Sequence, residues 1–213
     1  MATQIRSGQK ILFIGDSITD CGRRDSQRPL GNGYVKLLAD LMIIREPSKR
    51  VEIINKGIGG DNVVGLRNRW ADDVLRNRPD WLSIKIGIND LHGHLFNNRK
   101  DLAPKQYEEA YREILERTRQ ALPKCRILLI DPFYISCDTA PNSQRKQVLD
   151  LMPDYLAIVD RLSRIFKTRH IKTHELFGRL LKCHEPDTFC PEPVHPSLTG
   201  HLAIAEAIYQ ALS

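Results

Sequence analysis

The sequence predicts an α/β fold in which a parallel sheet of five strands is covered by helices on both faces. Short apolar runs alternate along the chain with longer segments of helical periodicity, which is the pattern of parallel strands joined by crossover helices. The 213 residues, of which 41% are hydrophobic, suffice to bury a substantial core. Because we find no internal repeat, low-complexity tract or linker, residues 1–213 are expected to form one domain.

The predicted elements follow from these two periodicities. The apolar runs expected to be strands are Lys10 to Gly15, Arg50 to Lys56, Trp81 to Ile86, Arg126 to Asp131 and His170 to Thr173. The segments of helical period are Tyr34 to Arg45, Val63 to Asn77, Ala103 to Leu122, Gln144 to Thr168, which Pro153 interrupts, and Ser197 to Leu212. The longest irregular stretches are then Asp131 to Asn142 and Cys183 to Pro196.

Composition and charge argue against several classes of function. The formal net charge of +6 is spread in short basic pairs without interleaved aromatic residues, so we expect no nucleic-acid partner. No apolar run approaches the length of a membrane span, and the first ten residues lack the apolar stretch of a secretion signal. We therefore expect a cytoplasmic protein without a membrane partner. The five cysteines are an odd number without a CxxC pair, which favours reduced thiols.

Ligands of open parallel sheets bind outside the carboxyl ends of the strands, so polar residues directly after a strand are the candidates for function. The first strand runs into Gly15-Asp16-Ser17. Glycine permits a sharp turn at the strand end, which would hold Ser17 at the sheet edge, where its hydroxyl could act as a nucleophile. The alternative role for this serine is a helix cap.

Two further loops supply candidate hydrogen-bond donors. The glycine cluster from Asn55 to Asn62 comes after the second strand and could bring bare backbone N–H groups close to a negatively charged oxygen. A dinucleotide loop is disfavoured there, because the glycines do not follow the G-x-G-x-x-G spacing. After the third strand, the Asn89 amide could add another donor to an oxyanion. For both loops a plain turn is the alternative.

The candidate general base lies near the carboxyl terminus. His195 stands in a loop bracketed by Pro193 and Pro196, which could fix its imidazole near Ser17, and Glu192 is close enough in sequence to orient the ring. A loop histidine is usually only solvated. Here serine, glycine N–H groups, asparagine and histidine all fall where a parallel sheet would gather them, which favours a catalytic site.

The blocks GDSIT, NKGIGGDN, GIND and VHPSLTGH, in this order, resemble the four signature blocks of the SGNH (GDSL-type) hydrolases over essentially the whole chain. The stretches GDSITDCGR, NKGI, PDW and IGIND further resemble the bacterial acetylxylan-esterase-like branch of that family. The resemblance implies a flavodoxin-like, three-layer α/β/α sandwich with strand order 2-1-3-4-5. It also implies chemistry that needs neither a cofactor nor a metal.

The resemblance assigns a role to each candidate residue. It makes Ser17 the nucleophile, His195 the base and Asp16 a supporting residue, while the oxyanion hole consists of the Ser17 N–H, the Gly60 N–H and the Asn89 side chain. The implied activity is that of a serine esterase for short-chain esters, in the first place acetyl esters of carbohydrate alcohols. The alternatives are a lysophospholipase or thioesterase with longer acyl chains, and a carbohydrate-binding pseudoenzyme. A homo-oligomer is compatible with all three.

The sequence departs from the family pattern in the loop before His195. The family usually has Asp three residues before the histidine, where this chain has Glu192. The ring could therefore be oriented by Glu192, by Asp187 in the same loop or by a backbone carbonyl. The branch also tends to carry Trp just before the acid, where this chain has Pro191. Its tryptophans, Trp70 and Trp81, stand in helix and strand contexts that favour the core.

A metal site is a further alternative, because histidines and cysteines recur in short spacings. The candidate sets are His170 with His174, His184 with Cys183 and Cys190, and His92 with His94. We disfavour the first set because His170 is expected in a strand, where the i, i+4 geometry of a helix does not apply.

Overall fold

The computed structural model describes residues 2–213, and its centre is a sheet of five parallel strands. The order is β2-β1-β3-β4-β5, which confirms the predicted 2-1-3-4-5 arrangement. The strands are β1 (Lys10–Gly15), β2 (Glu52–Asn55), β3 (Trp81–Lys85), β4 (Arg126–Ile130) and β5 (Arg169–Ile171). β1 pairs with both β2 and β3, so the loops that follow these three strands leave the sheet side by side.

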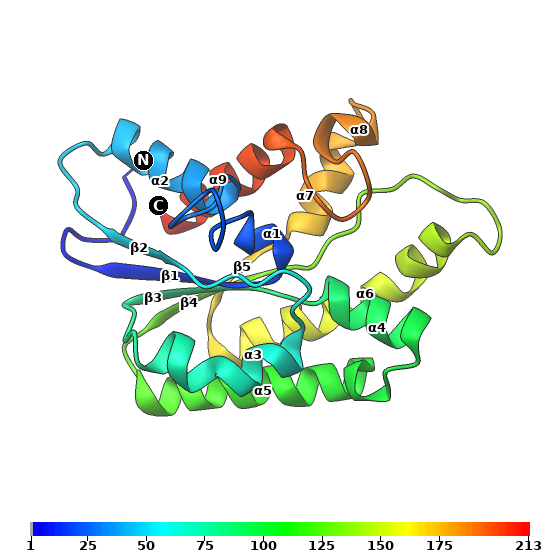
Figure 1. Cartoon of the computed structure of the whole chain (residues 1–213), viewed down its shortest axis with the longest axis horizontal. Coiled ribbons are helices and arrows are strands. Elements are labelled where there is room, and N and C mark those ends of the chain that lie inside the picture. The colour runs from blue at the N-terminus through cyan, green and yellow to red at the C-terminus, as the bar shows by residue number, and fades with distance from the viewer. Residues whose placement is uncertain (1) are drawn as a thin grey trace.

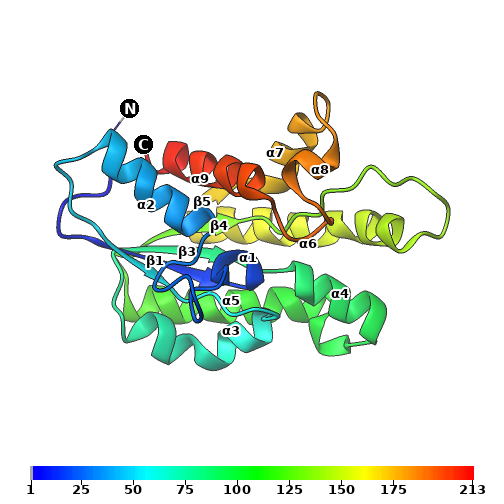
Figure 2. The same ribbon diagram turned by 45° about the horizontal axis from the view of Figure 1, so that its top comes forward.

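Helices cover both faces of the sheet and complete the three-layer α/β/α sandwich (Figures 1 and 2). One face carries α1 (Ser17–Asp20), α2 (Tyr34–Arg45), α7 (Thr173–Leu180), α8 (Pro186–Phe189) and α9 (Leu198–Leu212). The other carries α3 (Val63–Trp70), α4 (Ile88–Asn97), α5 (Pro104–Ala121) and α6 (Gln144–Phe166). A π-helical turn, Ala71–Leu75, extends α3, and a short 3₁₀ turn, Lys100–Leu102, precedes α5.

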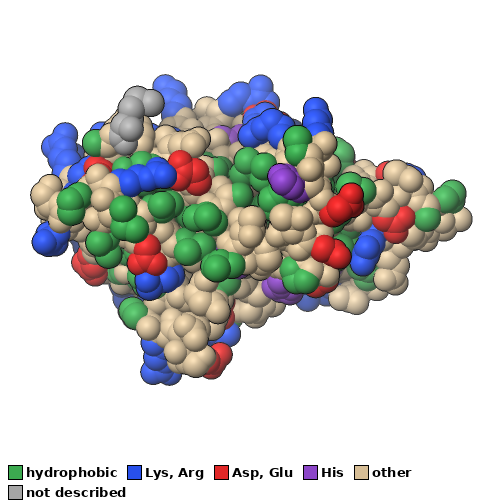
Figure 3. All heavy atoms as spheres, turned by 90° about the horizontal axis from the view of Figure 1, so that it is seen from above, with side chains coloured by type: hydrophobic (Ala, Val, Ile, Leu, Met, Phe, Trp, Pro, Cys, Tyr) green, Lys and Arg blue, Asp and Glu red, His purple; other side chains and the backbone are tan. Residues whose placement is uncertain are grey.

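The two ends of the described chain meet at the same end of the sandwich (Figure 1). The Gln4 N–H donates to the Leu212 carbonyl at 2.7 Å, which fastens the start of the chain to the end of α9. On the surface of the layer that contains α2, α7, α8 and α9, lysine and arginine side chains are spread among apolar and acidic ones (Figure 3). Among residues 2–213, no helix has the length and apolar character that crossing a membrane requires.

Local sequence signals explain several helix starts. Ser197 is the N-cap of α9, and its side chain accepts from the Gly200 N–H. Asn62 caps α3 in the same way by accepting from the Gly65 N–H at 3.0 Å. Pro104 opens α5, where its missing N–H would have had no partner in the helix.

Two expectations from the sequence were wrong, and two helices were not predicted. Pro153 does not interrupt α6, because buried apolar residues on both sides, among them Met152 and Tyr155, hold the helix against the sheet while Pro153 faces solvent. The segment after the third strand, for which a plain turn was the alternative, is the first turn of α4, a helix that was not predicted. The stretch Cys183 to Pro196, expected to be irregular, contains α8, and α7 was not predicted.

The core consists of the strands and the inner faces of the helices. β3 is buried along its whole length, and every residue of β1 after Lys10 is buried. Trp70 and Trp81 are 0% and 1% exposed, which confirms their expected core positions. The indole of Trp70 donates to the Thr118 hydroxyl at 3.0 Å, so its buried polar atom is satisfied.

The end of β1 leaves no room for a side chain at Gly15. A Cβ atom there would lie 2.2 Å from the Lys85 carbonyl oxygen of the neighbouring strand, whereas one at Gly178, in α7, would meet nothing within 4 Å. We expect Gly15→Ala to lower the free energy of unfolding by about 1–3 kcal/mol. Gly178→Ala should raise it by about 0.5–1 kcal/mol because alanine is the better helix former. Urea unfolding of both variants checks this; equal stability of the two would contradict it.

Candidate active site

The polar groups predicted from four separate loops lie at the carboxyl edge of the sheet. Ser17 is the first residue of α1, directly after β1, and Gly60 lies in the loop after β2. Asn89 is in the first turn of α4, after β3, and His195 precedes α9. The site is thus assembled from residues far apart in the chain, because parallel strands direct their following loops to one edge.

Ser17 and His195 are in direct contact. The Ser17 hydroxyl oxygen lies 2.8 Å from His195 Nε2, the distance of a hydrogen bond between a nucleophile and its base. The other ring nitrogen, Nδ1, contacts Glu192 Oε1. The His195 side chain is 58% exposed, so a substrate can reach the pair from solvent.

Glu192 is held by its own loop. Its carboxylate accepts the backbone N–H groups of Val194, at 2.9 Å, and of His195, at 2.7 Å. Burial raises the pKa of Glu192, but these N–H groups and the His195 ring lower it more, so the net pKa lies below the usual value. The side chain is therefore ionised at neutral pH and can stabilise a cationic imidazole.

Of the three candidates for orienting His195, the structure places Glu192 against the ring. Asp187 lies in α8, where it lines a cavity together with Glu192, and within residues 2–213 it makes no hydrogen bond to His195. The longer side chain of Glu, compared with the Asp usual in the family, still reaches Nδ1 from three residues before the histidine.

Two backbone N–H groups at the site lack an acceptor among the residues that the structure describes, those of Ser17 and Gly60. Gly60 has a φ of +78°, a conformation that glycine adopts without strain. The Asn89 side-chain amide donates to the Asp61 carbonyl oxygen at 2.9 Å. Because a primary amide has two N–H donors, this bond fixes Asn89 and leaves one donor for a ligand.

Asp16 performs the capping role that the sequence left open for Ser17. Its Oδ1 accepts from the Ile18 N–H at 3.0 Å, which caps α1 and leaves the Ser17 N–H and hydroxyl for other partners. Asp16 is 0% exposed and pairs with the equally buried ammonium of Lys85 at 3.2 Å. Burial lowers the pKa of Lys85, and Asp16 opposes that shift.

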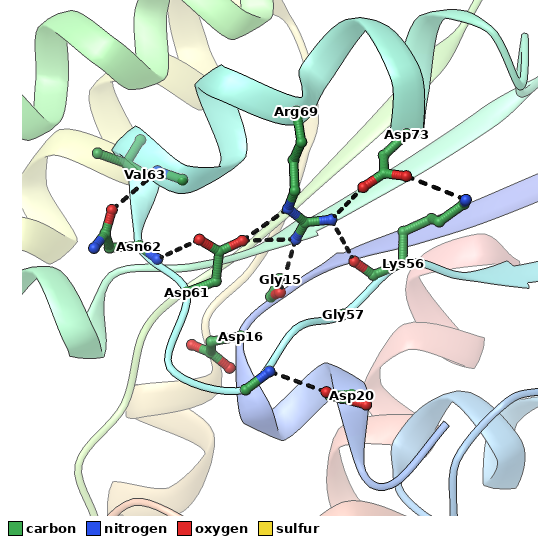
Figure 4. A network of polar contacts seen from close by, with 12 residues as sticks. Gly15, Asp16, Asp20, Lys56, Gly57, Asp61, Asn62, Val63, Arg69 and Asp73 are labelled. Atoms are coloured by element: carbon green, nitrogen blue, oxygen red, sulfur yellow. Dashed lines mark hydrogen bonds and ion pairs between the residues drawn. The ribbon is translucent and has the colours of Figure 1, made fainter. Parts of the chain in front are cut away.

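Three further residues that were not predicted from the sequence, Lys85, Asp20 and Asp90, hold the loops of the site in place. Lys85 could have been found as the one charged residue in the apolar run WLSIK. Asp20 accepts from the Gly59 N–H at 3.0 Å (Figure 4). Asp90 accepts from the Val63 N–H at 2.9 Å, and burial raises its pKa to about 8. These carboxylates connect the glycine loop and α3 to neighbouring elements.

The metal-binding alternative gains no support from the histidine positions. His170 Nε2 lies 2.5 Å from Asp131 Oδ1, while His174 Nδ1 accepts from the Tyr134 N–H at 3.5 Å, so the two rings have different partners. The His92 ring packs against Phe96 and Tyr134. Within residues 2–213, no three His, Cys, Asp or Glu side chains are grouped to hold a metal ion.

The fold, the contact of Ser17 with His195 and the contact of His195 with Glu192 are those of a serine hydrolase. Residues 13–203 match the model of the GDSL-like lipase/acylhydrolase family, and this chain belongs to that family. The chain is 34% identical to an acetylxylan esterase of Geobacillus stearothermophilus, over 98% of this chain and 96% of that one. It is also 26% identical to the uncharacterized protein YpmR of Bacillus subtilis, over 95% of this chain and 80% of that protein.

Solved structures agree with this placement. The crystal structure of the Geobacillus enzyme, Axe2, superimposes with a TM-score of 0.87 at 33% identity and covers 99% of this chain and 96% of its own. LAE5, an alpha/beta hydrolase from the metagenome of Lake Arreo, gives a TM-score of 0.85 at 28% identity, over 98% of this chain and 96% of that one. Catalytic mutants of Axe2 replace a serine, an aspartate or a histidine, the last two being three positions apart.

The position of Glu192 predicts its contribution to ester hydrolysis. Glu192→Gln keeps the size of the side chain but removes the charge that stabilises a cationic His195, so kcat for 4-nitrophenyl acetate should fall by about 10²- to 10⁴-fold. Asp187→Asn, in the same loop region, is the matched control and should stay within about threefold of wild type. The reverse ranking of the two variants would assign the orienting role to Asp187.

Proposed function

We propose that this chain is a serine esterase that removes acetyl groups from carbohydrate alcohols through an acyl-enzyme. The observation that carries the proposal is the 2.8 Å contact between the Ser17 hydroxyl and His195 Nε2, with Glu192 on the opposite ring nitrogen. The 34% identity to an enzyme named acetylxylan esterase supports the acetyl group and the carbohydrate.

In the first half of the reaction, the Ser17 oxygen attacks the ester carbonyl carbon while His195 Nε2 takes up the hydroxyl proton. The carbonyl oxygen becomes negatively charged in the tetrahedral intermediate, where the N–H groups of Ser17 and Gly60 and the free Asn89 amide N–H would donate to it. The intermediate then collapses as the bond to the alcohol oxygen breaks. Protonated His195 returns its proton to that oxygen, so the alcohol leaves neutral and the acetyl group remains on Ser17.

In the second half, a water molecule takes the place of the alcohol. His195 removes a proton from the water as its oxygen attacks the acyl carbon, and the same donors stabilise the second oxyanion. Collapse breaks the bond to Ser17, which regains a proton from His195, and acetic acid leaves. Glu192 stays ionised throughout, because its role is to orient and stabilise the imidazolium.

The surroundings of the catalytic pair suit a hydrophilic alcohol. A cavity of about 280 Å³ borders Glu192 and is lined by Ile135–Asp138, Arg145, Pro186, Asp187 and Cys190–Pro193. The Arg145 guanidinium has no hydrogen bond or ion pair among residues 2–213, so its donors are available to sugar hydroxyls. Asp138 and Asp187 offer acceptors, and the prolines offer flat apolar contacts for a sugar ring.

The proposal predicts hydrolysis that depends on one hydroxyl. Wild type should turn over 4-nitrophenyl acetate, because the Ser17 hydroxyl is in contact with a base that can remove its proton. Ser17→Ala should lower kcat/KM by about 10⁴-fold or more, since no nucleophile remains. A spectrophotometric assay with the uncatalysed rate subtracted measures both proteins.

Equal trace rates for wild type and Ser17→Ala would contradict the esterase. If both proteins then still bound acetylated xylo-oligosaccharides, the chain would be a carbohydrate-binding pseudoenzyme. Full folding of Ser17→Ala is checked by its thermal unfolding, which should match that of wild type because Ser17 caps no helix.

The cavity beside Glu192 predicts that one substitution changes the KM for substrates that contain a sugar and for no others. Arg145→Ala should raise KM for acetylated xylo-oligosaccharides by about tenfold, because hydrogen bonds to the hydroxyls are lost. Its kinetics with 4-nitrophenyl acetate, which lacks a sugar, should not change. Lys146→Ala is the control, since Lys146 pairs with exposed Asp150 and does not line the cavity. An equal loss on both substrates, or none on the sugar, would remove Arg145 from the sugar site.

A further inference from the structure

Arg69, in α3, lies at the centre of a polar network beneath the catalytic loops (Figure 4). A guanidinium carries five N–H donors, and Arg69 makes five contacts with them. Nε and Nη2 each lie 2.8 Å from Asp61 Oδ2, and Nη1 lies 2.7 Å from Asp73 Oδ2. Nη1 also donates to the Lys56 carbonyl at 2.7 Å, and Nη2 to the Gly15 carbonyl at 3.3 Å.

These contacts join three segments that are separate in the sequence. Gly15 is the last residue of β1, two residues before Ser17, and Lys56 directly follows β2. Asp61 directly follows Gly60 in the glycine loop (Figure 4). The single guanidinium therefore fixes the backbone on both sides of the site, at the start of the nucleophile turn and at both ends of the loop that carries the Gly60 N–H.

The same contact chain extends to the third predicted donor. Asp61 is held by Arg69 through its carboxylate, and its carbonyl oxygen accepts the Asn89 side-chain amide at 2.9 Å. Asp61 Oδ1 also accepts from the N–H of the next residue, Asn62, at 3.0 Å, which further fixes the Asp61 carboxylate (Figure 4). Displacement of Asp61 would thus move Asn89 together with the loop.

The two carboxylates that pair with Arg69 differ in the direction of their pKa shifts. Burial raises the pKa of Asp73, but hydrogen bonds from Arg69 and Lys56 lower it further, so its net pKa is below the usual value. For Asp61, burial outweighs the lowering effect of Arg69, and the net pKa is raised. Asp61 is therefore the carboxylate that depends most on its cation, and loss of Arg69 would leave it partly buried without one.

We propose that Arg69 is a positioning residue for the oxyanion hole, which sets the Ser17 turn, the Gly60 loop and Asn89 relative to one another. This inference rests on the esterase function proposed above. Arg69 does not contact the substrate itself, because its side chain is only 16% exposed and all five donors are used within the protein. Its loss should therefore weaken transition-state stabilisation rather than substrate binding.

The test is a double-mutant cycle between Arg69 and Asn89, measured with 4-nitrophenyl acetate. Arg69→Met removes the guanidinium at similar volume and should lower kcat by about 10- to 100-fold, with KM within about twofold of wild type. Asn89→Ala should lower kcat by about 10²- to 10³-fold. Because both changes damage the same hole, the double variant should lose clearly less than the product of the two single losses.

The matched control is Arg67→Met, two residues earlier in α3, which removes only an exposed pair with Glu113. It should keep wild-type kcat and KM. If Arg69→Met does not fold, Asp61→Asn replaces it in the cycle. This substitution keeps the side-chain volume at position 61 and weakens the ion pair with Arg69. Thermal unfolding of each variant ensures that the rates refer to folded protein.

Two results would overturn the inference. One is a kcat of Arg69→Met, or of Asp61→Asn in its place, within about twofold of wild type. The other is a kcat loss that multiplies fully with that of Asn89→Ala, because independent effects add in free energy. Failure of the esterase proposal is recognised separately, since wild type would then show no hydrolysis that depends on Ser17.

Discussion

The parallel pairing of β1 with β2 on one side and β3 on the other is the constraint on which the rest of the structure depends. It brings the Ser17 turn, the glycine loop and the start of α4 to one edge, although they are separated by dozens of residues in the chain. Close approach of these segments requires Gly57, where a Cβ atom would lie 2.3 Å from the Asp20 backbone nitrogen. The proposed nucleophile and the proposed oxyanion donors thus share one compact scaffold.

The two halves of the site differ in how they are held. The donor side is fixed by buried and half-buried polar contacts, from the Asp16 cap of α1 to the Asn89 bond with Asp61. The proposed base lies on a proline-bracketed loop, where the side chain of His195 is 58% exposed and that of Glu192 is 48% exposed. Fixed hydrogen-bond donors opposite an accessible base suit the proposed reaction, in which charge develops on the carbonyl oxygen. The exposure of the base lets the alcohol leave to solvent and water enter from it.

Much of this could be predicted from the sequence, because each strand is a short apolar run and each candidate site residue directly follows a strand or precedes the last helix. Helices α4 and α7 were missed because their short segments carry Asn, Asp, His and Gly, residues that are also typical of turns. Lys85 stands out in the sequence only as the charged residue of an apolar run, and neither it nor Arg69 could be given a partner in advance. Their partners are contributed by other strands and loops, so only the tertiary structure shows which charges meet.

The buried pair of Asp16 and Lys85 also constrains how this sequence can diverge. Loss of either partner leaves an uncompensated charge in the interior, at a cost of about 3–5 kcal/mol, whereas replacing both by apolar or neutral residues can be close to neutral. Asp16 further caps α1, so its substitution also removes a hydrogen bond from the turn that carries Ser17. Substitutions at Asp16 and Lys85 are therefore expected to occur together among relatives of this protein.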